Sequence, residues 1–247
     1  MFFLESDAQA RELQKALDII KGIYARYFAS DMLIALERNM GFLQDARFMA
    51  AFESEQRDAQ DAGLLWRLHV LCWCAGNALE LAGDFVECGV FRGFSTSVAA
   101  KYLDFGARAK TWHLYDTFSG IPADQLDPGL VNPEAFRDPA LHAAVVQRFA
   151  PYRNVVIHRG RVPEVLAGTA PARIAFLHLD LNSAGAELGA LEALYDRLVP
   201  GAYVLLDDYG WYPYRRQKAT EDAFFSARGS QVLELPTGQG LVIKNRG

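Results

Sequence analysis

The run Val86-Glu87-Cys88-Gly89-Val90-Phe91-Arg92-Gly93-Phe94-Ser95 marks a change of pattern in this 247-residue chain. A short apolar strand, residues 85–88, enters a turn with two glycines, and a helix is predicted over residues 95–105. Glycine permits a tight turn and lets a ligand approach the backbone at the start of the helix. The spacing is G-x-x-x-G, which differs from the G-x-G-x-x-G turn of dinucleotide-binding proteins. The run therefore indicates a strand–turn–helix unit that either binds a ligand or packs a helix closely.

Short apolar runs and amphipathic runs alternate after this unit. Strands are predicted at residues 111–116, 155–158, 174–180 and 202–208, and helices at residues 133–150, 163–167, 186–198 and 214–228. Two further strands, residues 231–235 and 241–244, are joined by the turn PTGQG and predict a hairpin. This alternation predicts an α/β domain with a doubly wound, mostly parallel sheet covered on both faces. Ligands bind such sheets at the carboxyl ends of the strands.

The first 82 residues differ, because their apolar residues recur at helical spacing. Helices are predicted around residues 13–24, over residues 30–43 and over residues 64–81. The third is the most apolar, but Arg67 and Glu80 interrupt it and favour a buried helix over a membrane span. We therefore expect an N-terminal helical extension, residues 1–82, that caps a site or contacts another subunit. A ligand-binding α/β domain follows at residues 83–247.

The composition is typical of a soluble globular protein, with 51% hydrophobic and 22% charged residues. A net charge of −5 gives no general attraction to nucleic acid or to an anionic membrane. The first residues lack the basic and apolar segments of a signal peptide. Cys72, Cys74 and Cys88 lack paired spacing, which favours core packing over disulfides. We expect a cytoplasmic protein without nucleic-acid or membrane partners, and a homo-oligomer stays open.

Two acidic residues at strand ends indicate the chemistry of the ligand. Glu87 sits in the glycine turn, where a carboxylate would repel a pyrophosphate and attract the amino group or sulfonium of S-adenosylmethionine. Asp116 ends the next strand, where a carboxylate can hold the ribose hydroxyls of a nucleoside. The alternatives are glycines that only permit close packing and an aspartate that only caps a loop. Together the two residues favour S-adenosylmethionine over a nicotinamide cofactor.

Three carboxylates follow two further strands: Asp180 after one, and Asp207 with Asp208 after the next. Adjacent parallel strands would bring them together, and their repulsion would raise a pKa unless a cation lies between them. Mg²⁺, which prefers oxygen ligands, would resolve this and could lower the pKa of a substrate hydroxyl. The alternative is that Asp208 caps a helix while Asp207 is solvated. We predict a metal site made of these three residues.

Aromatic and histidine side chains near these strand ends are further candidates. The run Tyr209-Gly210-Trp211-Tyr212-Pro213-Tyr214 suits contact with a flat ring or a sugar face, or packing as a lid. His178 lies on an apolar strand and is expected in the core. His142 and His158 lie near the crevice and are candidates for proton transfer.

Four runs together resemble the macrocin O-methyltransferase family of bacterial, metal-dependent methyltransferases: GDFVECGVFRG, YDTFSGIP, the strand ending HLD, and LVPGAYVLLDDYG. The resemblance spans roughly residues 83–244. It implies a class I methyltransferase fold, Rossmann-like, with seven strands and an antiparallel last strand. It also implies that the donor methionine lies along Glu87, Gly89 and Gly93, the ribose at Asp116, the adenine beside Gly160, Arg161 and Val162, and the metal on Asp180, Asp207 and Asp208.

The chain departs from this family at the residue that resembles a general base. The family pattern HLDxDxY has its second Asp where this chain has Asn182, and its Tyr where this chain has Ala184. An amide cannot accept a proton. The base therefore stays open, with Asp180, Asn182, Asp207 and His142 as the residues expected around the reaction.

These observations predict a methyltransferase that uses S-adenosylmethionine and, with Mg²⁺, methylates a hydroxyl of a sugar or another small molecule of natural-product or glycan type. The alternatives are a donor-binding or regulatory protein without catalysis and a nicotinamide-dependent oxidoreductase. The residues expected to form the donor site are Glu87, Cys88, Gly89, Val90, Phe91, Gly93, Ser95, Asp116, Thr117, Phe118, Gly160, Arg161, Val162 and Asp180.

Overall fold

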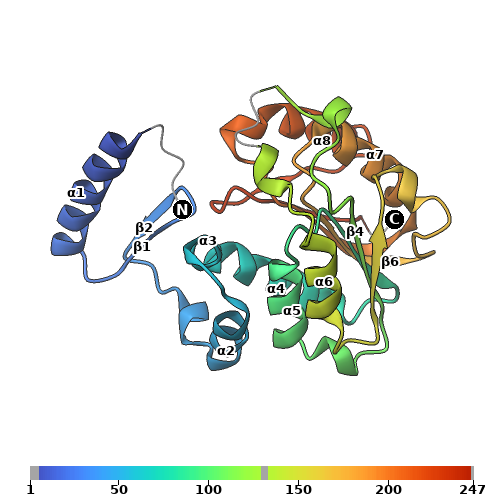
Figure 1. Cartoon of the computed structure of the whole chain (residues 1–247), viewed down its shortest axis with the longest axis horizontal. Coiled ribbons are helices and arrows are strands. Elements are labelled where there is room, and N and C mark those ends of the chain that lie inside the picture. Colours follow the sequence, from blue (N-terminus) through green and yellow to red (C-terminus); the bar gives the residue numbers. More distant parts are fainter. Residues whose placement is uncertain (1–5, 129–132, 246–247) are drawn as a thin grey trace.

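A computed structural model describes residues 6–128 and 133–245 of the chain. Its main feature within these ranges is a seven-stranded sheet of order β5-β4-β3-β6-β7-β9-β8 (Figure 1). The strand pairs are parallel from β5 to β7, and β9 runs antiparallel to both β7 and β8. This confirms the predicted doubly wound, class I methyltransferase sheet. The strands are β3 (Asp84–Cys88), β4 (Trp112–Asp116), β5 (Val155–Arg159), β6 (Ile174–Leu179), β7 (Leu198–Leu206), β8 (Leu233–Glu234) and β9 (Gly240–Ile243).

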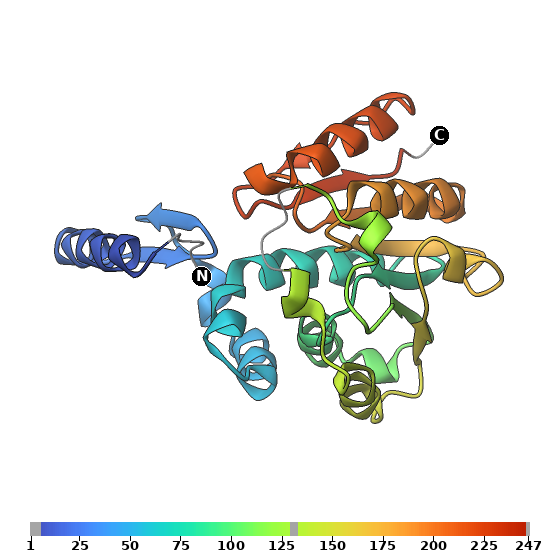
Figure 2. The ribbon, with the colours of Figure 1, turned by 45° about the horizontal axis from the view of Figure 1, so that its top comes forward.

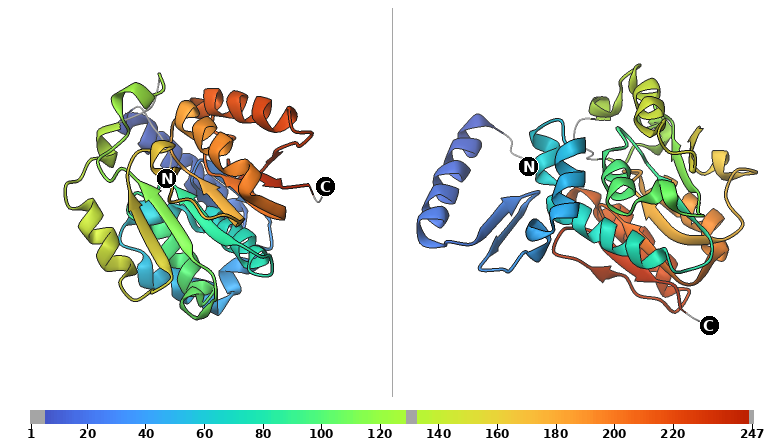
Figure 3. Two further views of the ribbon diagram at one scale, coloured as in Figure 1. Left: turned by 90° about the vertical axis from the view of Figure 1, so that its right-hand side faces the viewer. Right: turned by 90° about the horizontal axis from the view of Figure 1, so that it is seen from below.

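Helices cover both faces of this sheet, as Figures 2 and 3 show. On one face lie α4 (Leu65–Ala78), α5 (Phe94–Tyr102) and α6 (Leu141–Phe149), and on the other α7 (Ala184–Leu194) and α8 (Arg215–Ser226). Because side chains alternate along a strand, Phe85 and Phe176 enter the first core while Val86 and Leu177 enter the second. This two-sided burial explains the nearly continuous apolar character of the central strands.

Short 3₁₀ turns connect several of these elements: η1 (Gly41–Gln44), η2 (Phe105–Ala107), η3 (Ala123–Gln125), η4 (Pro133–Phe136), η5 (Glu164–Leu166), η6 (Tyr195–Arg197) and η7 (Tyr212–Tyr214). The helix predicted over residues 133–150 is divided into η4 and α6, with the break near Pro139 that proline favours. Within the described part of the chain, no helix combines the length and apolar character needed to cross a bilayer.

The N-terminal block is not wholly helical. It contains α1 (Asp7–Ile23), a hairpin of β1 (Tyr27–Ser30) and β2 (Leu33–Leu36), α2 (Ala46–Glu55) and α3 (Ala59–Gly63). The helix predicted over residues 30–43 is therefore wrong. Asp31 and Met32 adopt positive φ angles of 51° and 56°, which suit a two-residue hairpin turn and end any helix.

The block also divides spatially. Helix α1 and the hairpin form an arm that projects from the body of the molecule (Figures 1 and 2). Helix α2 packs on α5, and α4 packs directly on β6 and β7. By its packing α4 therefore belongs to the sheet domain, although it precedes residue 83 in the chain.

Candidate active site

A cavity of about 300 Å³ lies at the carboxyl ends of β3, β4, β6 and β7, where ligands bind in this class of fold. The glycine turn lines one part of it and the carboxylates after β6 and β7 line another. The arm contributes Asp31 from the hairpin turn, and α4 contributes Arg67. A single cavity therefore joins the two regions that the sequence singled out separately.

The two glycines of the turn are required by close packing. Gly89 has a φ of 91°, and a Cβ there would lie 1.9 Å from the Asp180 carbonyl oxygen. Gly93 has a φ of 67°, and a Cβ would lie 2.7 Å from Phe149 Cε2. Gly89 also lines the cavity, together with Val90, Phe91 and Ser95, whereas Gly93 does not. Packing and ligand access therefore coincide at Gly89, while Gly93 serves packing.

The Asp116 carboxylate holds the glycine turn in place. Its Oδ2 accepts hydrogen bonds from the backbone N–H groups of Val90 and Phe91, each at 2.8 Å. Its Oδ1 accepts from the Phe118 N–H at 2.6 Å. Asp116 also lines the cavity. The acidic residue at the end of β4 thus connects two loops that border the expected donor position.

A buried histidine links Glu87 to the acidic cluster, which consists of Asp180, Asp207 and Asp208. His178 Nδ1 lies 3.1 Å from Glu87 Oε1, and His178 Nε2 lies 3.5 Å from Asp207 Oδ1. Burial lowers the pKa of His178, but its hydrogen bonds to Asp207 and Glu87 and their charges outweigh burial and raise it to about 10. We expected His178 to be an ordinary core residue, and it is indeed 1% exposed. Its position between two carboxylates favours the protonated form of the imidazole.

Arg67 occupies the centre of the acidic cluster. Its Nε donates to Asp31 Oδ2 at 2.8 Å, and Nη1 and Nη2 each donate to Asp208 Oδ1 at 3.2 Å. Nη1 also donates to Asp207 Oδ2. The Trp211 ring lies 4.8 Å from the guanidinium carbon. Burial alone would lower the pKa of Arg67, but the charges of these carboxylates raise it above its ordinary value.

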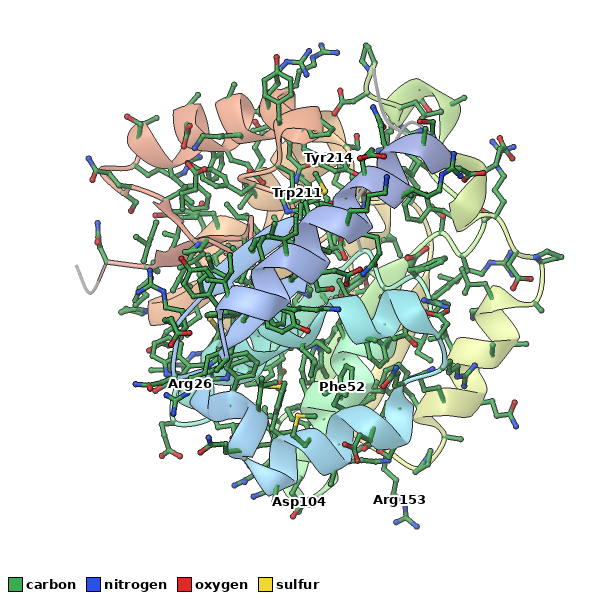
Figure 4. The ribbon with its side chains drawn as sticks, turned by 90° about the vertical axis from the view of Figure 1, so that its left-hand side faces the viewer. Arg26, Phe52, Asp104, Arg153, Trp211 and Tyr214 are labelled. Carbon is green, nitrogen blue, oxygen red and sulfur yellow. The ribbon has the colours of Figure 1, made fainter. Side chains whose placement is uncertain are left out.

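A second chain of hydrogen bonds runs along the cavity wall. Tyr214 donates its hydroxyl proton to Asn182 Oδ1, and Asn182 Nδ2 donates to Asp180 Oδ1 at 3.2 Å. Burial and the charges of Asp207 and Asp208 raise the pKa of Asp180. Tyr214 follows Trp211 in one turn, closed by a backbone hydrogen bond of 2.9 Å, and Figure 4 shows both beyond α1. Both aromatic residues line the cavity, as the sequence suggested.

The remaining predicted residues divide between the cavity and its surroundings. Thr117, Gly160 and Val162 line the cavity, and the Gly160 N–H donates to the Asp116 carbonyl at 2.9 Å. Arg161 points outward and binds Asp124. Cys88 is buried and is not among the lining residues.

Three ring-bearing residues that the sequence placed near the site, Phe118, His142 and His158, are not among those that line the cavity. The Phe118 ring packs 5.0 Å from the His142 ring, and neither residue lines the cavity. His158 instead stacks on Tyr115, with ring centroids 4.5 Å apart, and its Nε2 lies 3.0 Å from His113 Nδ1. We therefore give neither His142 nor His158 a part in proton transfer.

The side chains as placed do not fit a divalent ion. No group of three or more His, Cys, Asp or Glu side chains is arranged to hold a metal in the ranges that the structure covers. The Arg67 guanidinium already lies between Asp207 and Asp208. Sequence reasoning missed Arg67 and its partner Asp31. A signal existed, because an arginine inside an apolar helix needs carboxylate partners when it is buried.

Comparisons with known proteins show which family this chain resembles. Residues 67–229 match the family model described as macrocin-O-methyltransferase (TylF). The chain is 28% identical over 210 residues to mycinamicin III 3''-O-methyltransferase of Micromonospora griseorubida, which covers 78% of this chain and 82% of that protein. It is 31% identical over 192 residues to 8-demethyl-8-(2,3-dimethoxy-alpha-L-rhamnosyl)-tetracenomycin-C 4'-O-methyltransferase of Streptomyces olivaceus, over 71% of this chain and 70% of that one.

The fold has solved relatives as well. The O-methyltransferase NovP superposes with a TM-score of 0.63 at 23% identity, over 74% of this chain and 81% of that chain. The family model matches more than half of the chain and includes the glycine turn, Asp116 and the acidic cluster. The resemblance inferred from four sequence runs is confirmed, and the nicotinamide-dependent alternative is not supported. The chain belongs to the macrocin-O-methyltransferase family of S-adenosylmethionine-dependent methyltransferases.

Proposed function

We propose that this protein transfers the methyl group of S-adenosylmethionine to a hydroxyl of a sugar, free or attached to a small molecule. The observation that carries the proposal is the single cavity, in which the glycine turn and Asp116 adjoin Asp180, Trp211 and Tyr214. Aromatic faces beside polar groups suit the apolar face and the hydroxyls of a sugar ring. Two relatives named above are 3''-O- and 4'-O-methyltransferases, one of a rhamnosyl compound, which supports the same acceptor class.

The donor is assigned to the side of the cavity next to β3 and β4. Asp116 and Glu87 place two carboxylates on this side, where they favour a sulfonium, an amino group and ribose hydroxyls, and Glu87 is itself held by Thr96 and His178. We assign direct donor contacts to Glu87, Gly89, Val90, Phe91, Ser95, Asp116, Thr117, Gly160 and Val162, which all line the cavity. Cys88, Gly93, Phe118 and Arg161 support the surrounding loops.

Asp180 is assigned as the proton acceptor. Its Oδ2 has no hydrogen-bond donor among the described residues, while Oδ1 is held by Asn182. When bound, S-adenosylmethionine supplies an electrophilic methyl group, so the acceptor oxygen forms the C–O bond while the C–S bond breaks and its electron pair stays on sulfur. Asp180 takes the hydroxyl proton, and later exchange with water restores its carboxylate.

Asn182 and Asp207 are assigned positioning parts. Asn182 cannot accept the proton, but it links the Tyr214 hydroxyl to Asp180 and so fixes the carboxylate. Asp207 receives donors on both oxygens, from His178 and Gln239 on Oδ1 and from Arg67 on Oδ2. Asp207 therefore binds Arg67, His178 and Gln239, and it is not assigned as the acceptor of the substrate proton.

The sequence predicts Mg²⁺ assistance at Asp180, Asp207 and Asp208. The carboxylates have the right chemistry for Mg²⁺. Two of the three, however, already bind the Arg67 guanidinium. No step of the proposed reaction is therefore assigned to a metal.

Turnover with defined acceptors tests the proposed function. The purified chain, S-adenosylmethionine and a panel of deoxysugar nucleotides, glycosylated natural products and simple phenols would be incubated and followed by mass spectrometry. A mass gain of one methylene on a sugar hydroxyl, with S-adenosylhomocysteine formed, is expected. Asp180→Asn should lower this rate ~10²–10⁴-fold while S-adenosylhomocysteine still binds. Binding of S-adenosylhomocysteine without any product across the panel would instead identify a donor-binding protein without catalysis.

The N-terminal arm is proposed to contact another copy of the chain as well as to border the acceptor position. Ile19 and Ile23 are 65% and 68% exposed on α1, and Ile34 of the hairpin is 40% exposed. Exposed apolar side chains gathered on a projecting segment are typical of interfaces. The hairpin turn also brings Asp31 to the cavity. The division at residues 82 and 83 is retained only as a proposal about chain segments, because α4 packs with the sheet domain.

A further inference from the structure

We propose that Arg67 is the resident cation of the acidic cluster and occupies the position where the sequence predicts a divalent metal, so that this methyltransferase works without one. The contacts of Arg67 itself show that a guanidinium lies among these carboxylates. Only the further part, that the guanidinium binds the acceptor hydroxyl, rests on the proposed function.

The contacts of Arg67 account for most of its donors. A guanidinium carries five N–H groups. Nε–H binds Asp31, the two Nη1–H groups bind Asp207 and Asp208, and one Nη2–H binds Asp208. One Nη2–H has no partner among the described residues. Because Arg67 lines the cavity, this remaining donor is available to an acceptor oxygen.

The same contacts leave too few carboxylate oxygens for a metal. Mg²⁺ requires near-octahedral oxygen ligands at about 2.0–2.1 Å. Both oxygens of Asp207 and Oδ1 of Asp208 already accept hydrogen bonds from protein donors. The guanidinium would also repel a dication placed beside it. A divalent ion could enter only by expelling Arg67 from its partners.

The position of Arg67 is fixed by elements on three sides. Helix α4 packs on β6 and β7 and carries the guanidinium to the ends of these strands. The Trp211 ring covers it at 4.8 Å, and Asp31 reaches it from the arm. The side chain is 8% exposed. A cation attached to the backbone and enclosed in this way does not depend on metal supply.

This arrangement changes what the site can do to a hydroxyl. A metal lowers the pKa of a bound hydroxyl strongly, whereas a guanidinium orients it and stabilises developing negative charge through a hydrogen bond. Proton removal must then fall to a carboxylate. Asp180 is placed for this, because it lies next to Asn182 and its Oδ2 accepts no hydrogen bond from the residues that the structure describes. Asn182, which cannot accept a proton, and Arg67 thus belong to one arrangement.

Metal binding tests the proposal without any need for turnover. The full chain, dialysed against EDTA and saturated with S-adenosylhomocysteine, would be titrated with Mn²⁺ and followed by electron paramagnetic resonance. The wild type should leave the Mn²⁺ signal free. Arg67→Met should bind one ion per chain, because the carboxylates lose their cation while the side-chain length is kept. Arg67→Lys, which keeps the charge, should bind none.

A matched control comes from Arg148, another buried arginine. Its Nη1 lies 2.9 Å from Glu55 Oε2, and neither residue lines the cavity. Arg148→Met should bind no Mn²⁺, since it frees one carboxylate rather than a cluster. Stoichiometric, micromolar Mn²⁺ binding by the wild type would overturn the proposal, whether or not Arg67→Met folds. A folded Arg67→Met protein that binds no Mn²⁺ would also count against it.

Turnover measurements then test whether the Arg67 guanidinium binds the acceptor hydroxyl. Wild-type turnover should change by less than about two-fold in excess EDTA, since no metal ion is required. Arg67→Met should lose ~10²-fold in kcat, as when one donor to a developing oxyanion is removed. Added Mg²⁺ should restore part of that loss in Arg67→Met alone. Loss of wild-type turnover in EDTA would overturn the inference while leaving the methyltransferase assignment intact.

Discussion

Asp31, in the turn of the N-terminal hairpin, accepts a hydrogen bond from Arg67 Nε at 2.8 Å. The two side chains are 11% and 8% exposed, and both line the cavity. The contact therefore joins the projecting arm to α4 and to the ends of β6 and β7. The arm therefore contributes a side chain to the cavity as well as extending from the body.

Replacing Asp116 should impair donor binding. Asp116→Ala removes three charge-assisted hydrogen bonds to the loops at the donor position, besides the proposed ribose contact. Isothermal titration should show S-adenosylhomocysteine binding weakened by about 10²-fold or more. Asp104→Asn, at an exposed position labelled in Figure 4, serves as the control and should bind as the wild type does. Equal affinities of both variants for S-adenosylhomocysteine would show that Asp116 does not contribute to donor binding.

Gly89 should tolerate no side chain. A Cβ would lie 1.9 Å from the Asp180 carbonyl oxygen, and the φ of 91° strains any L-residue. Gly89→Ala should lower the free energy of unfolding by about 2–4 kcal/mol in urea denaturation. Gly185→Ala is the matched control in α7, where no atom lies within 4 Å of the new Cβ. That variant should gain about 0.5–1 kcal/mol, as helix propensity dictates. Similar stability of the two variants would contradict the close approach at Gly89.

Asn182 and Tyr214 should act together on turnover rather than on donor binding. Asn182→Ala frees the Asp180 carboxylate from its hydrogen bond, and Tyr214→Phe removes the hydroxyl that holds Asn182. Each should lower kcat about 10-fold, and the double variant should lose little more, because both belong to one chain of contacts. Tyr212→Phe, at a position 79% exposed, should leave kcat unchanged. Fully additive losses would show that the two residues act independently.

The buried pair Glu187 and Glu221 should make stability fall as pH rises. Both carboxyl groups are 0% exposed between α7 and α8. Burial raises the pKa of Glu221 to about 7, from 4.5 in the unfolded chain. The folded state therefore holds a proton that the unfolded state releases, and its stability declines between about pH 4.5 and pH 7.

Glu221→Gln removes that penalty and keeps the shape of the side chain. It should stabilise the protein by a few kcal/mol in urea at pH ~8 and much less at pH ~5. Glu192→Gln, on the exposed side of α7, is the control and should follow the wild-type pH profile. If the stability of Glu221→Gln depended on pH as that of the wild type does, this pair would not be the group that holds the proton.

The arm should govern association between copies. Ile19→Lys with Ile23→Lys places two charges where exposed apolar side chains now lie on α1. Light scattering after size exclusion should show a dimer or larger species for the wild type and a monomer for this variant. Val146→Lys, at an exposed valine of α6 that is 46% accessible, should not change the mass. A monomeric wild type at high concentration would reject the interface.

Much of the fold could be predicted from the chain because it rests on local periodicity. The apolar run at residues 85–88, the alternation after it and the turn PTGQG were sufficient to predict seven strands that end in a hairpin. The glycine turn and Asp116 could be placed together for the same reason, since the strand ends in such a sheet meet at one edge. The hairpin at residues 27–36 was missed, because residues 30–43 also show helical spacing and the turn at Asp31 has no glycine.

The sequence by itself determined the sheet, the glycine turn and the gathering of Asp180, Asp207 and Asp208, because each follows from spacing along the chain and the geometry of parallel strands. Only the tertiary structure decided which cation lies among these carboxylates. Arg67 stands 140 residues before Asp207 in the chain, and its guanidinium reaches the cluster because α4 packs across β6 and β7. No periodicity encodes that contact. It arises because a buried arginine and buried carboxylates must each find an opposite charge, and the fold brings them within hydrogen-bonding distance.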